Sequence, residues 1–361
     1  MDSTVDELKT RVAALREDAA ASAPTHPDIA RWRTATDADI DAIHAVIAAA
    51  DAVDHPTWIT PREDIADTFD VPHIDHTSDT ILALDAGGTV VAFGSAFLHP
   101  SRAGALTSHL GGAVRPDLRR RGIGSVVMAW QRARGLEQIA DALASLDAGD
   151  DAGVAGEAER WTADLKAYAE ESQPGQQAIA AGAGLTPERW FTTMERDMGV
   201  AVPAISAAGE IALVPYTHDR DDDARLARND AFRDHWGSLP SQPETWGKFV
   251  GGAFFRPDLS RLAVAPDGAV VGFCLASVNE DDWVALGASS AYIDLIGVVR
   301  SHRRRGIAPA VIAATLDAIA AAGLERAVLD VDTASPTGAN ALYENLGFRA
   351  TDRQIAFVLH L

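Results

Sequence analysis

The sequence predicts a mixed α/β protein built from two tandem copies of one domain, each with a mixed, mostly antiparallel sheet flanked by helices. Two observations support this prediction. The chain has 361 residues, about twice the roughly 150 residues of a typical domain. A strand–turn–helix segment also occurs twice, each time after a pattern typical of a β-hairpin, which favours antiparallel pairing over repeated βαβ units.

The repeat is clearest at an arginine-rich turn, which reads RRRGIG at 119–124 and RRRGIA at 303–308. Upstream, a glycine-bearing turn followed by a β-branched run occurs at 85–93 and again at 266–273, as expected for hairpins. The turn and its hairpin therefore recur together, which a chance arginine cluster would not do.

A second pair of matching turns lies downstream, at 183–185 and 346–348. These two are closer together in sequence than the arginine-rich turns, so the first half must contain an insertion. The Ala/Gly/Asp-rich run 146–156 lies at the right place and is predicted to be a solvated loop.

The elements are expected in the same order in each half. Strands are expected near 29–34 and 210–215, hairpins at 80–98 and 260–278, and strands at 105–114 and 290–299 ahead of the arginine-rich turn and a helix. A helix with a Thr4–Glu7 capping box precedes them. The expected domains are an N-terminal helix and linker at 1–28, a first domain at 29–198, a linker at 199–209 and a second domain at 210–361.

Composition excludes several classes of function. A formal charge of −21 argues against non-specific nucleic-acid binding and against attachment to an anionic membrane. The single cysteine, Cys274, lies in an apolar strand-like run, which indicates a buried thiol rather than a nucleophile. With no signal peptide or apolar span in the sequence, we expect a cytoplasmic protein.

The arginine-rich turn has the features of a phosphate site. Gly306 permits a tight turn that brings backbone amides forward, and the following helix contributes a partial positive charge at its N-terminus. A solvated charge run is the alternative, but recurrence at the same junction favours a site for a diphosphate. The sequence contains neither a P-loop nor a dinucleotide fingerprint. His73 and His76 lack an evident third ligand, so no metal site is predicted.

The turn, followed by LYENLGF at 342–348, resembles the GNAT superfamily of acyl-CoA-dependent N-acetyltransferases. Two such units in one chain resemble the tandem GNAT group of actinobacteria that includes mycothiol synthase. The resemblance covers roughly residues 29–361 and includes the run 229–237. It implies acetyl-CoA as cosubstrate, no metal and a small-molecule amine as acceptor.

The resemblance also implies cofactor contacts. In the second half these are the backbone of Ile296, Val298 and Val299, the turn formed by Arg303, Arg304, Arg305, Gly306, Ile307 and Ala308, and the pantetheine partners Ser335 and Asn340. Ser335 stands where the family often has asparagine, and Asn340 is a possible substitute. In the first half the corresponding residues are Val114, Arg119, Arg120, Arg121, Gly122, Ile123 and Gly124.

Two residues are candidates for proton transfer. Tyr343 matches the family tyrosine that protonates the departing thiolate, and the alternative is a core aromatic. Asp294 lies in the strand before the turn and is the candidate base, and the alternative is a structural aspartate. The first half has Ala180 and Leu110 at the corresponding sequence positions, so we expect it to bind CoA without catalysis or to be structural.

Asp234, His235 and Trp236 fall where the family contacts the acceptor, or else form a helix end with a core tryptophan. The sequence therefore predicts an acetyltransferase whose second domain transfers acetyl to an amine by direct attack in a ternary complex. An acyl-CoA sensor without turnover and a mycothiol-type acetyltransferase are the alternatives. We expect a monomer, as a pseudo-dimer of domains, or a homodimer, with no nucleic-acid or membrane partner.

Overall fold

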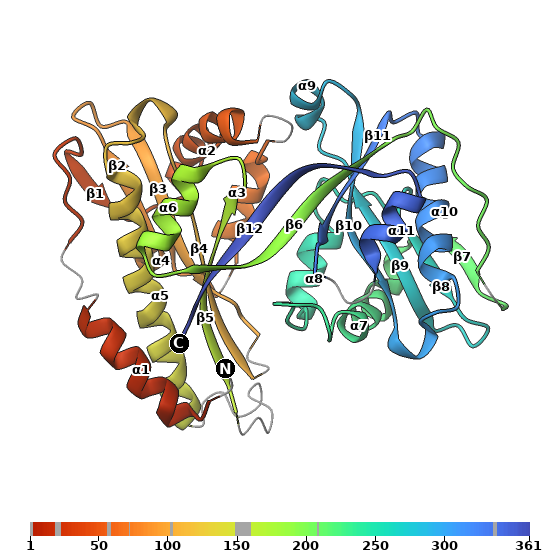
Figure 1. The fold of residues 1–361 in the computed structure, drawn as a ribbon, viewed down its shortest axis with the longest axis horizontal. Coiled ribbons are helices and arrows are strands. Elements are labelled where there is room, and N and C mark those ends of the chain that lie inside the picture. The colour runs from red at the N-terminus through yellow and green to blue at the C-terminus, as the bar shows by residue number, and fades with distance from the viewer. Residues whose placement is uncertain are drawn as a thin grey trace. The chain divides into compact units, whose positions relative to one another are not determined.

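The computed structural model describes residues 3–18, 23–55, 59–71, 73–101, 104–148, 160–207, 209–334 and 338–361. The chain forms two compact units (Figure 1). The first comprises Met1–Arg189 and Gln354–Leu361, and the second comprises Trp190–Arg353. Each unit has helices on both faces of a mostly antiparallel sheet, which confirms the predicted fold class.

The helices and strands of the first unit are α1 (Val5–Asp18), β1 (Arg31–Arg33), α2 (Ile40–Asp54), α3 (Arg62–Phe69), α4 (His76–Asp79), β2 (Thr80–Leu84), β3 (Val90–Leu98), β4 (Ala105–Val114), α5 (Ile123–Ala148), β5 (Thr162–Glu170) and α6 (Pro174–Gly182). Strand β6 (Thr186–Asp197) begins in the first unit and ends in the second. The second unit continues with β7 (Ala212–Pro215), α7 (Asp221–Ala231), α8 (Pro243–Val250), β8 (Arg261–Val264), β9 (Val270–Ser277), α9 (Asp282–Leu286), β10 (Ser290–Val298), α10 (Ile307–Ala321), β11 (Arg326–Asp332) and α11 (Ala339–Asn345), and β12 (Arg349–His360) returns to the first unit. The predicted strands and hairpins are confirmed.

The first unit's sheet has the order β1-β2-β3-β4-β5-β12. Side chains alternate between its faces. Ile81 and Ala83 of β2 pack with residues of α5, whereas Leu82 and Leu84 pack with residues of α2 and α3. All five residues of β2 are buried because helices cover both faces.

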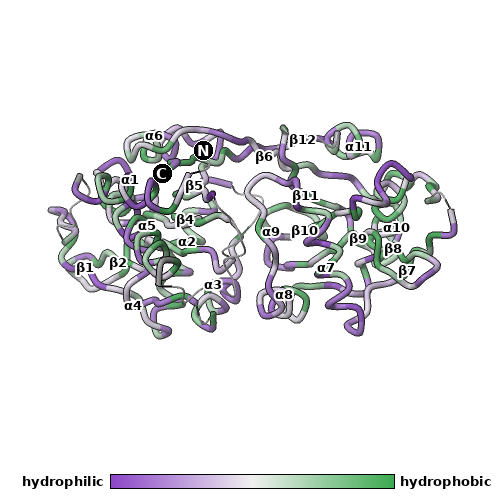
Figure 2. The backbone as a smooth tube through the Cα atoms, turned by 90° about the horizontal axis from the view of Figure 1, so that it is seen from below, coloured by the Kyte–Doolittle hydropathy of each residue, from purple (hydrophilic) through white to green (hydrophobic). Residues whose placement is uncertain are grey.

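The second unit repeats this arrangement in the order β7-β8-β9-β10-β11-β6. Cys274 and Ala276 of β9 pack with α10 and α11, whereas Phe273 and Leu275 pack with α7 and α8. The helices on the two faces differ in composition. In Figure 2, α7 is mostly hydrophilic along its length, whereas α10 is mostly hydrophobic. Burial raises the pKa of the Cys274 thiol to about 12, so the predicted core thiol is confirmed.

The last strand of each sheet comes from the other half of the chain. β12 pairs with β5 over Gln354–His360, and β6 pairs with β11 over Phe191–Asp197. The units therefore differ from the predicted ranges 29–198 and 210–361, because the final residues belong to the first unit and the second begins within β6. Motif spacing predicts that a strand exists, but it does not identify the sheet that the strand joins.

The N-terminal helix belongs to the first unit. Leu8 and Val12 are buried and α1 packs against α5. The predicted capping box is present, since the Thr4 amide donates to Glu7 Oε2 (2.9 Å) and the Glu7 amide donates to Thr4 Oγ1 (3.3 Å). The helix that was predicted within a separate segment 1–28 is thus part of the first unit.

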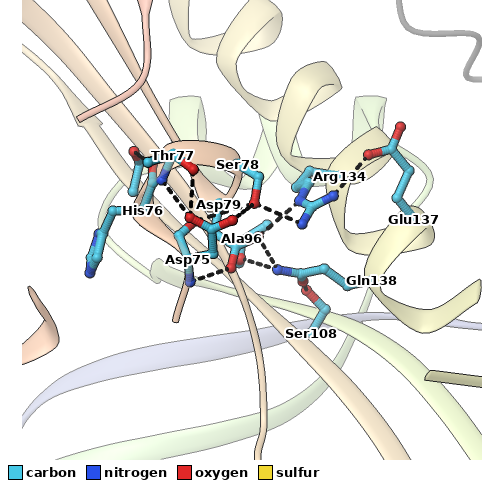
Figure 3. A network of polar contacts seen from close by, with 11 residues as sticks. Asp75, His76, Thr77, Ser78, Asp79, Ala96, Ser108, Arg134, Glu137 and Gln138 are labelled. Atoms are coloured by element: carbon cyan, nitrogen blue, oxygen red, sulfur yellow. Dashed lines mark hydrogen bonds and ion pairs between the residues drawn. The ribbon is translucent and has the colours of Figure 1, made fainter. Parts of the chain in front are cut away.

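A buried polar network joins α5 to the sheet of the first unit (Figure 3). Asp79 accepts hydrogen bonds from Arg134 Nε (2.8 Å) and from the Gln138 amide (2.8 Å). The Gln138 amide also donates to the Ala96 carbonyl (2.6 Å), and its oxygen accepts from the Ser108 hydroxyl (2.7 Å). These contacts stabilise the packing of α5 against β3 and β4.

The histidine segment before β2 has a structural role. His76 stacks on Phe69 with ring centroids 3.7 Å apart, and its Nε2 lies 2.9 Å from the Thr68 carbonyl. In the described ranges no group of three or more His, Cys, Asp or Glu side chains is arranged to hold a metal. Over the same ranges, no helix has both the length and the apolar character needed to cross a bilayer.

Arg196 of β6 is a buried guanidinium that binds the loops of the second unit. Its nitrogens donate to the carbonyls of Leu346 (2.8 Å), Val200 (3.0 Å) and Ala201 (3.0 Å). Burial lowers its pKa. Because Leu346 directly follows α11, this one side chain holds the end of the helix that contains Tyr343.

We expect Arg196→Met to destabilise the second unit by about 1–3 kcal/mol, because it leaves the carbonyl of the buried Leu346 without a donor and removes the bonds to Val200 and Ala201. Urea unfolding of the full-length protein measures the loss. Arg349→Met, at an exposed position of the same unit, is the control and should shift the midpoint little. Equal effects of the two variants would contradict the role given to Arg196.

His109 of β4 predicts a pH dependence of stability. Burial lowers its pKa to about 4, and the positive charges of Lys166 and His99 add to the effect. An unfolded histidine has a pKa of about 6.5, so between these values the unfolded state binds more protons. Stability must therefore fall as pH drops from about 6.5 to 4, by at most about 3 kcal/mol from this group.

Urea unfolding at several pH values checks this expectation. His109→Gln should flatten the loss of stability between pH 6.5 and 4. His218→Gln, at an exposed histidine, should leave the slope as in the wild type. An unchanged slope in His109→Gln would mean that other groups cause the acid sensitivity.

Candidate functional site

In the second unit, the parallel strands β10 and β11 separate before they end. They pair only from Ser290↔Arg326 to Tyr292↔Val328, although β10 continues to Val298 and β11 to Asp332. Beyond the paired residues, the edges of β10 and β11 that face each other no longer pair, and their backbone groups could bind a ligand instead. This geometry suits a chain-like ligand that contains amide groups.

A β-bulge interrupts β10 at the point of separation. Ile293 pairs with Ala276 and Leu295 with Leu275 of β9, so Asp294 is the extra residue. A bulge disrupts the ladder locally and redirects a side chain, and bulges are common beside active sites. Asp294 is half-buried, and its charge adds to burial in raising the pKa of the Cys274 thiol, which places the carboxylate near the core of this unit.

The arginine-rich turn follows β10 and has an unusual backbone. Arg304 has a φ of 61° and Gly306 a φ of 71°, whereas Arg303 has a φ of −63°. Arg303 has a ψ of 157° and is extended, so the two left-handed residues form a tight turn directly before α10. Gly306 is the N-cap of α10, so the first free amides of that helix lie at this turn, where an anion can bind.

The Arg303 side chain is occupied by protein groups. Its guanidinium donates to the Ala231 carbonyl (2.8 Å) and to Asp234 (3.1 Å), and its Nε lies 3.4 Å from the Val298 carbonyl. Arg303 therefore holds the turn in place, whereas the side chains of Arg304 and Arg305 are exposed. Of the three predicted arginines, these two are the ones whose side chains are exposed.

The other predicted backbone contacts fall on the separated strand, with one difference. Ile296 and Val298 lie in the part of β10 that does not pair with β11, although it still pairs with β9. The Val299 amide donates to the Val271 carbonyl (3.0 Å), and its carbonyl accepts from His302 (2.9 Å). The backbone of Val299 is thus used within the turn, which leaves Ile296 and Val298 as the better candidates.

Tyr343 lies in α11, with its ring 6.0 Å from that of Phe348 and a residue exposure of 8%. Burial raises its pKa, so the phenol is protonated at neutral pH. Asn340 donates to the Thr333 carbonyl (3.2 Å) and so bridges the loop between β11 and α11. Ser335, the other predicted pantetheine partner, lies outside the described residues.

The segment after α7 contains the three predicted acceptor residues. Asp234 forms ion pairs with Arg300 and Arg303. His235 has its ring 5.2 Å from that of Phe232, and Trp236 lies 6.2 Å from Phe191 of β6. The structure thus brings Asp234 to the turn and Trp236 to the sheet, so these neighbours contact different parts of the unit.

One carboxylate beside the separated strands was missed by the sequence analysis. Asp330 of β11 is exposed and accepts hydrogen bonds from the Tyr292 hydroxyl (2.8 Å) and from Thr193 Oγ1 (2.6 Å). The three residues come from adjacent strands, and Thr193 pairs directly with Asp330. Alternation along 326–332 could have placed Asp330 on a solvent-facing side, but the sequence contains no signal for its partners.

The first unit keeps the turn almost unchanged. Arg120 has a φ of 64° and Gly122 a φ of 95°, and Arg119 binds Asp54 (2.6 and 2.8 Å) and the Val114 carbonyl (3.1 Å). β4 and β5 also separate after His109↔Lys166. Ile123 and Gly124 begin α5 as Ile307 and Ala308 begin α10, and Arg121 approaches Asp28 (3.5 Å).

Other features of the first unit differ. β4 pairs with β3 without a shift, and Ala96 pairs with Leu110 as Ala276 pairs with Ile293. Leu110 therefore corresponds to Ile293, which corrects the sequence-based match to Asp294. The bulge residue has no counterpart. Ala180 does correspond to Tyr343, because the two helices end with equivalent bonds, Leu185 N to Ala180 O and Phe348 N to Tyr343 O.

The first unit also has a bridge between α6 and α2. The Gln176 side chain donates to Asp54 (2.9 Å), the carboxylate that binds Arg119. Ala339 is the residue at the matching position of α11, and it has no side chain that could make this bond. The bridge joins the two helices beside the separated strands and is specific to the first unit.

Comparisons with known proteins agree with this geometry. Residues 222–348 match the model of the acetyltransferase (GNAT) family. The chain is 29% identical over 244 residues to a mycothiol acetyltransferase of Clavibacter michiganensis, covering 65% of this chain and 67% of that protein. It is 27% identical over 346 residues to the mycothiol acetyltransferase of Gordonia bronchialis, covering 90% and 94%. Its fold is similar to a tandem GNAT protein from the clavulanic acid biosynthesis pathway, with a TM-score of 0.64, 17% identity and coverage of 91% and 98%.

We expect Gly306→Val to weaken the binding of coenzyme A at least about tenfold. A β-branched residue strongly disfavours the positive φ, so the turn would rearrange and withdraw its amides. The nearest atom to an added Cβ is the Ser206 carbonyl oxygen at 3.9 Å, so the effect comes from conformation rather than from a clash. Isothermal titration with coenzyme A measures the affinity and the stoichiometry.

The matched control is Gly122→Val, which imposes the same strain on the first unit's turn. If only the second unit binds the cofactor, Gly122→Val lowers stability and leaves affinity and stoichiometry unchanged. Wild-type affinity and stoichiometry in Gly306→Val would show that this turn is not the phosphate site.

Proposed function

Because this chain belongs to the GNAT acetyltransferase family, with two GNAT units in tandem, we propose that its second unit transfers acetyl from acetyl-CoA to a small-molecule amine. One observation supports this assignment above all. In the second unit the separated strands, the bulge at Asp294 and the tight turn at the N-terminus of α10 occur together with a buried tyrosine on α11. The first unit has the turn and the separated strands but not the bulge or the tyrosine.

Each part of acetyl-CoA has a matching feature. The α10 N-terminus offers N–H donors to a diphosphate, and the exposed Arg304 and Arg305 add positive charge in a protein of net charge −21. The free edge of β10 near Ile296 and Val298 can pair with the amides of pantetheine, as an added strand would. The thioester would then lie near the bulge.

The proposed reaction is a direct transfer in a ternary complex. The neutral amine attacks the thioester carbonyl, a C–N bond forms, the C–S bond breaks, and one proton leaves the nitrogen while one reaches the sulfur. An alkyl amine of pKa about 10.4 costs roughly 4 to 5 kcal/mol to deprotonate at pH 7. Asp294 is the proposed base, acting directly or through water, and Tyr343 is the proposed acid for the thiolate.

Other features limit the mechanism. Cys274 is fully buried and its pKa is raised to about 12, so a thiolate that could form an acetyl-cysteine intermediate is disfavoured. The first unit has no counterpart of Asp294 and has Ala180 in place of Tyr343. We therefore propose that this unit does not catalyse the reaction.

The acceptor is proposed to be an amine that approaches the side of the sheet where Asp330 and Trp236 lie. An exposed carboxylate held by two hydroxyl groups is suited to bind a cationic or hydroxyl group of such a molecule. The curated relatives are mycothiol acetyltransferases, which supports an amine precursor of mycothiol as the first candidate to test. A nucleic-acid partner is disfavoured by the charge of −21.

A screen of amines with acetyl-CoA tests the function, with free thiol release as the readout. It should include mycothiol precursors, amino sugars, polyamines and amino acids. Turnover with one class identifies the acceptor. Tight coenzyme A binding without acetylation of any amine would instead support the alternative of an acyl-CoA sensor.

We expect Tyr343→Phe to lower kcat by about 10²- to 10⁴-fold, as loss of a positioned general acid typically does. The acetyl-CoA affinity should change little, because the turn lies on another element. Steady-state kinetics on the amine found in the screen, together with coenzyme A titration, measures both. Tyr168→Phe, at an exposed position of the first unit, should retain wild-type kcat. Equal kcat for Tyr343→Phe and wild type would remove Tyr343 from the mechanism.

A further inference from the structure

The segment that follows α7, residues 232–242, has three separate anchors within the second unit. At its far end, Arg228 of α7 donates to the Leu239 carbonyl (2.6 Å), and Asn229 exchanges hydrogen bonds with Ser241 (2.8 and 3.1 Å). In the middle, Trp236 packs near Phe191 of β6. At its start, Asp234 forms ion pairs with the arginine-rich turn.

The third anchor joins two functional regions. Asp234 Oδ2 accepts from Arg303 (3.1 Å), and its other oxygen accepts from Arg300. Asp230, at the end of α7, accepts from the backbone amide of Arg300 (2.9 Å). The turn proposed to hold the cofactor phosphates is thus connected directly to the segment that presents Trp236.

The matching ion pair in the first unit differs in its environment. Asp54 is the last residue of α2, its side chain is 6% exposed, and it also accepts from Gln176. Asp234 lies in the segment beyond α7, with a side chain that is 47% exposed. An exposed ion pair adds little to the stability of a fold, whereas breaking a buried one is strongly destabilising. Asp54 therefore suits a structural role, and Asp234 adds little stability.

We propose that Asp234 is a positioning residue that couples the cofactor turn to the segment 232–242. This rests on the proposed function of the second unit. Asp234 holds the segment against the turn, so that Trp236 is placed for the acceptor by the same residues that orient the phosphates. It also neutralises part of the charge on Arg300 and Arg303, which would otherwise attract the cofactor more strongly.

The two effects of Asp234 predict opposite results for Asp234→Asn. Affinity for coenzyme A should be unchanged or up to several-fold tighter, because the arginines lose their negative partner. The segment should loosen, so that amide hydrogen exchange in peptides covering 232–242 rises several-fold. With the amine from the screen, the acceptor KM should rise more than kcat falls. Asp234→Glu should restore the exchange and KM at least partly.

Asp54→Asn is the matched control. It should lower the stability of the first unit and leave coenzyme A affinity and exchange in 232–242 as in the wild type. Exchange that does not change in Asp234→Asn would overturn the proposal. So would a parallel loss of coenzyme A affinity and thermal stability, since that pattern indicates a purely structural residue. Failure of the wild type itself to bind coenzyme A would instead refute the proposed function, and the exchange experiment would still report on the ion pair.

Discussion

The separation of two parallel strands is the constraint on which the second unit's site depends. β10 and β11 pair over three positions and then separate, and the residues that follow can no longer satisfy one another's backbone groups. The bulge at Asp294 lies just beyond the last paired residues, where it bends β10 and redirects a side chain. The turn after β10 then directs its amides toward the same end of the sheet. A ligand that contains amides and a diphosphate could pair with the free edge of β10 and bind the amides of the turn. The geometry therefore agrees with the similarity to GNAT acetyltransferases.

Both units use one device to hold the turn, and they differ in what surrounds it. Arg119 and Arg303 each bind a carbonyl of the preceding strand and a carboxylate, which is the last residue of α2 in the first unit and lies just beyond α7 in the second. In the first unit this carboxylate is buried and shared with Gln176. In the second it is exposed and belongs to the segment that includes Trp236. The same local fold therefore surrounds a buried carboxylate in one copy and an exposed carboxylate near Trp236 in the other.

Much of the fold could be predicted from the sequence, because hairpins, turns and the Thr4–Glu7 cap leave local patterns. The turn at 303–308 was found for the same reason, and so was the buried state of Cys274. Other features depend on pairing, which local patterns do not contain. Because of the bulge, Leu110 corresponds to Ile293 in the structure and not to Asp294, as the sequence spacing had predicted. The hydrogen-bond partners of Asp330 come from two other strands. The bonds that the Arg303 side chain and the Val299 backbone make within the protein also have no signal in the sequence. Such contacts become visible only when distant segments are placed together.

The exchange of strands between the two halves affects how the protein can form in the cell. The first unit's sheet receives its last strand from residues 354–360, which are synthesised after nearly all of the second unit. During translation, the edge of β5 must therefore wait for a partner while the second unit emerges, and an exposed edge is prone to pair with other chains. The first half cannot complete its folding in the order of synthesis. The sheet of the first unit is completed only after the second half of the chain has been synthesised, so the two units finish folding together rather than one after the other.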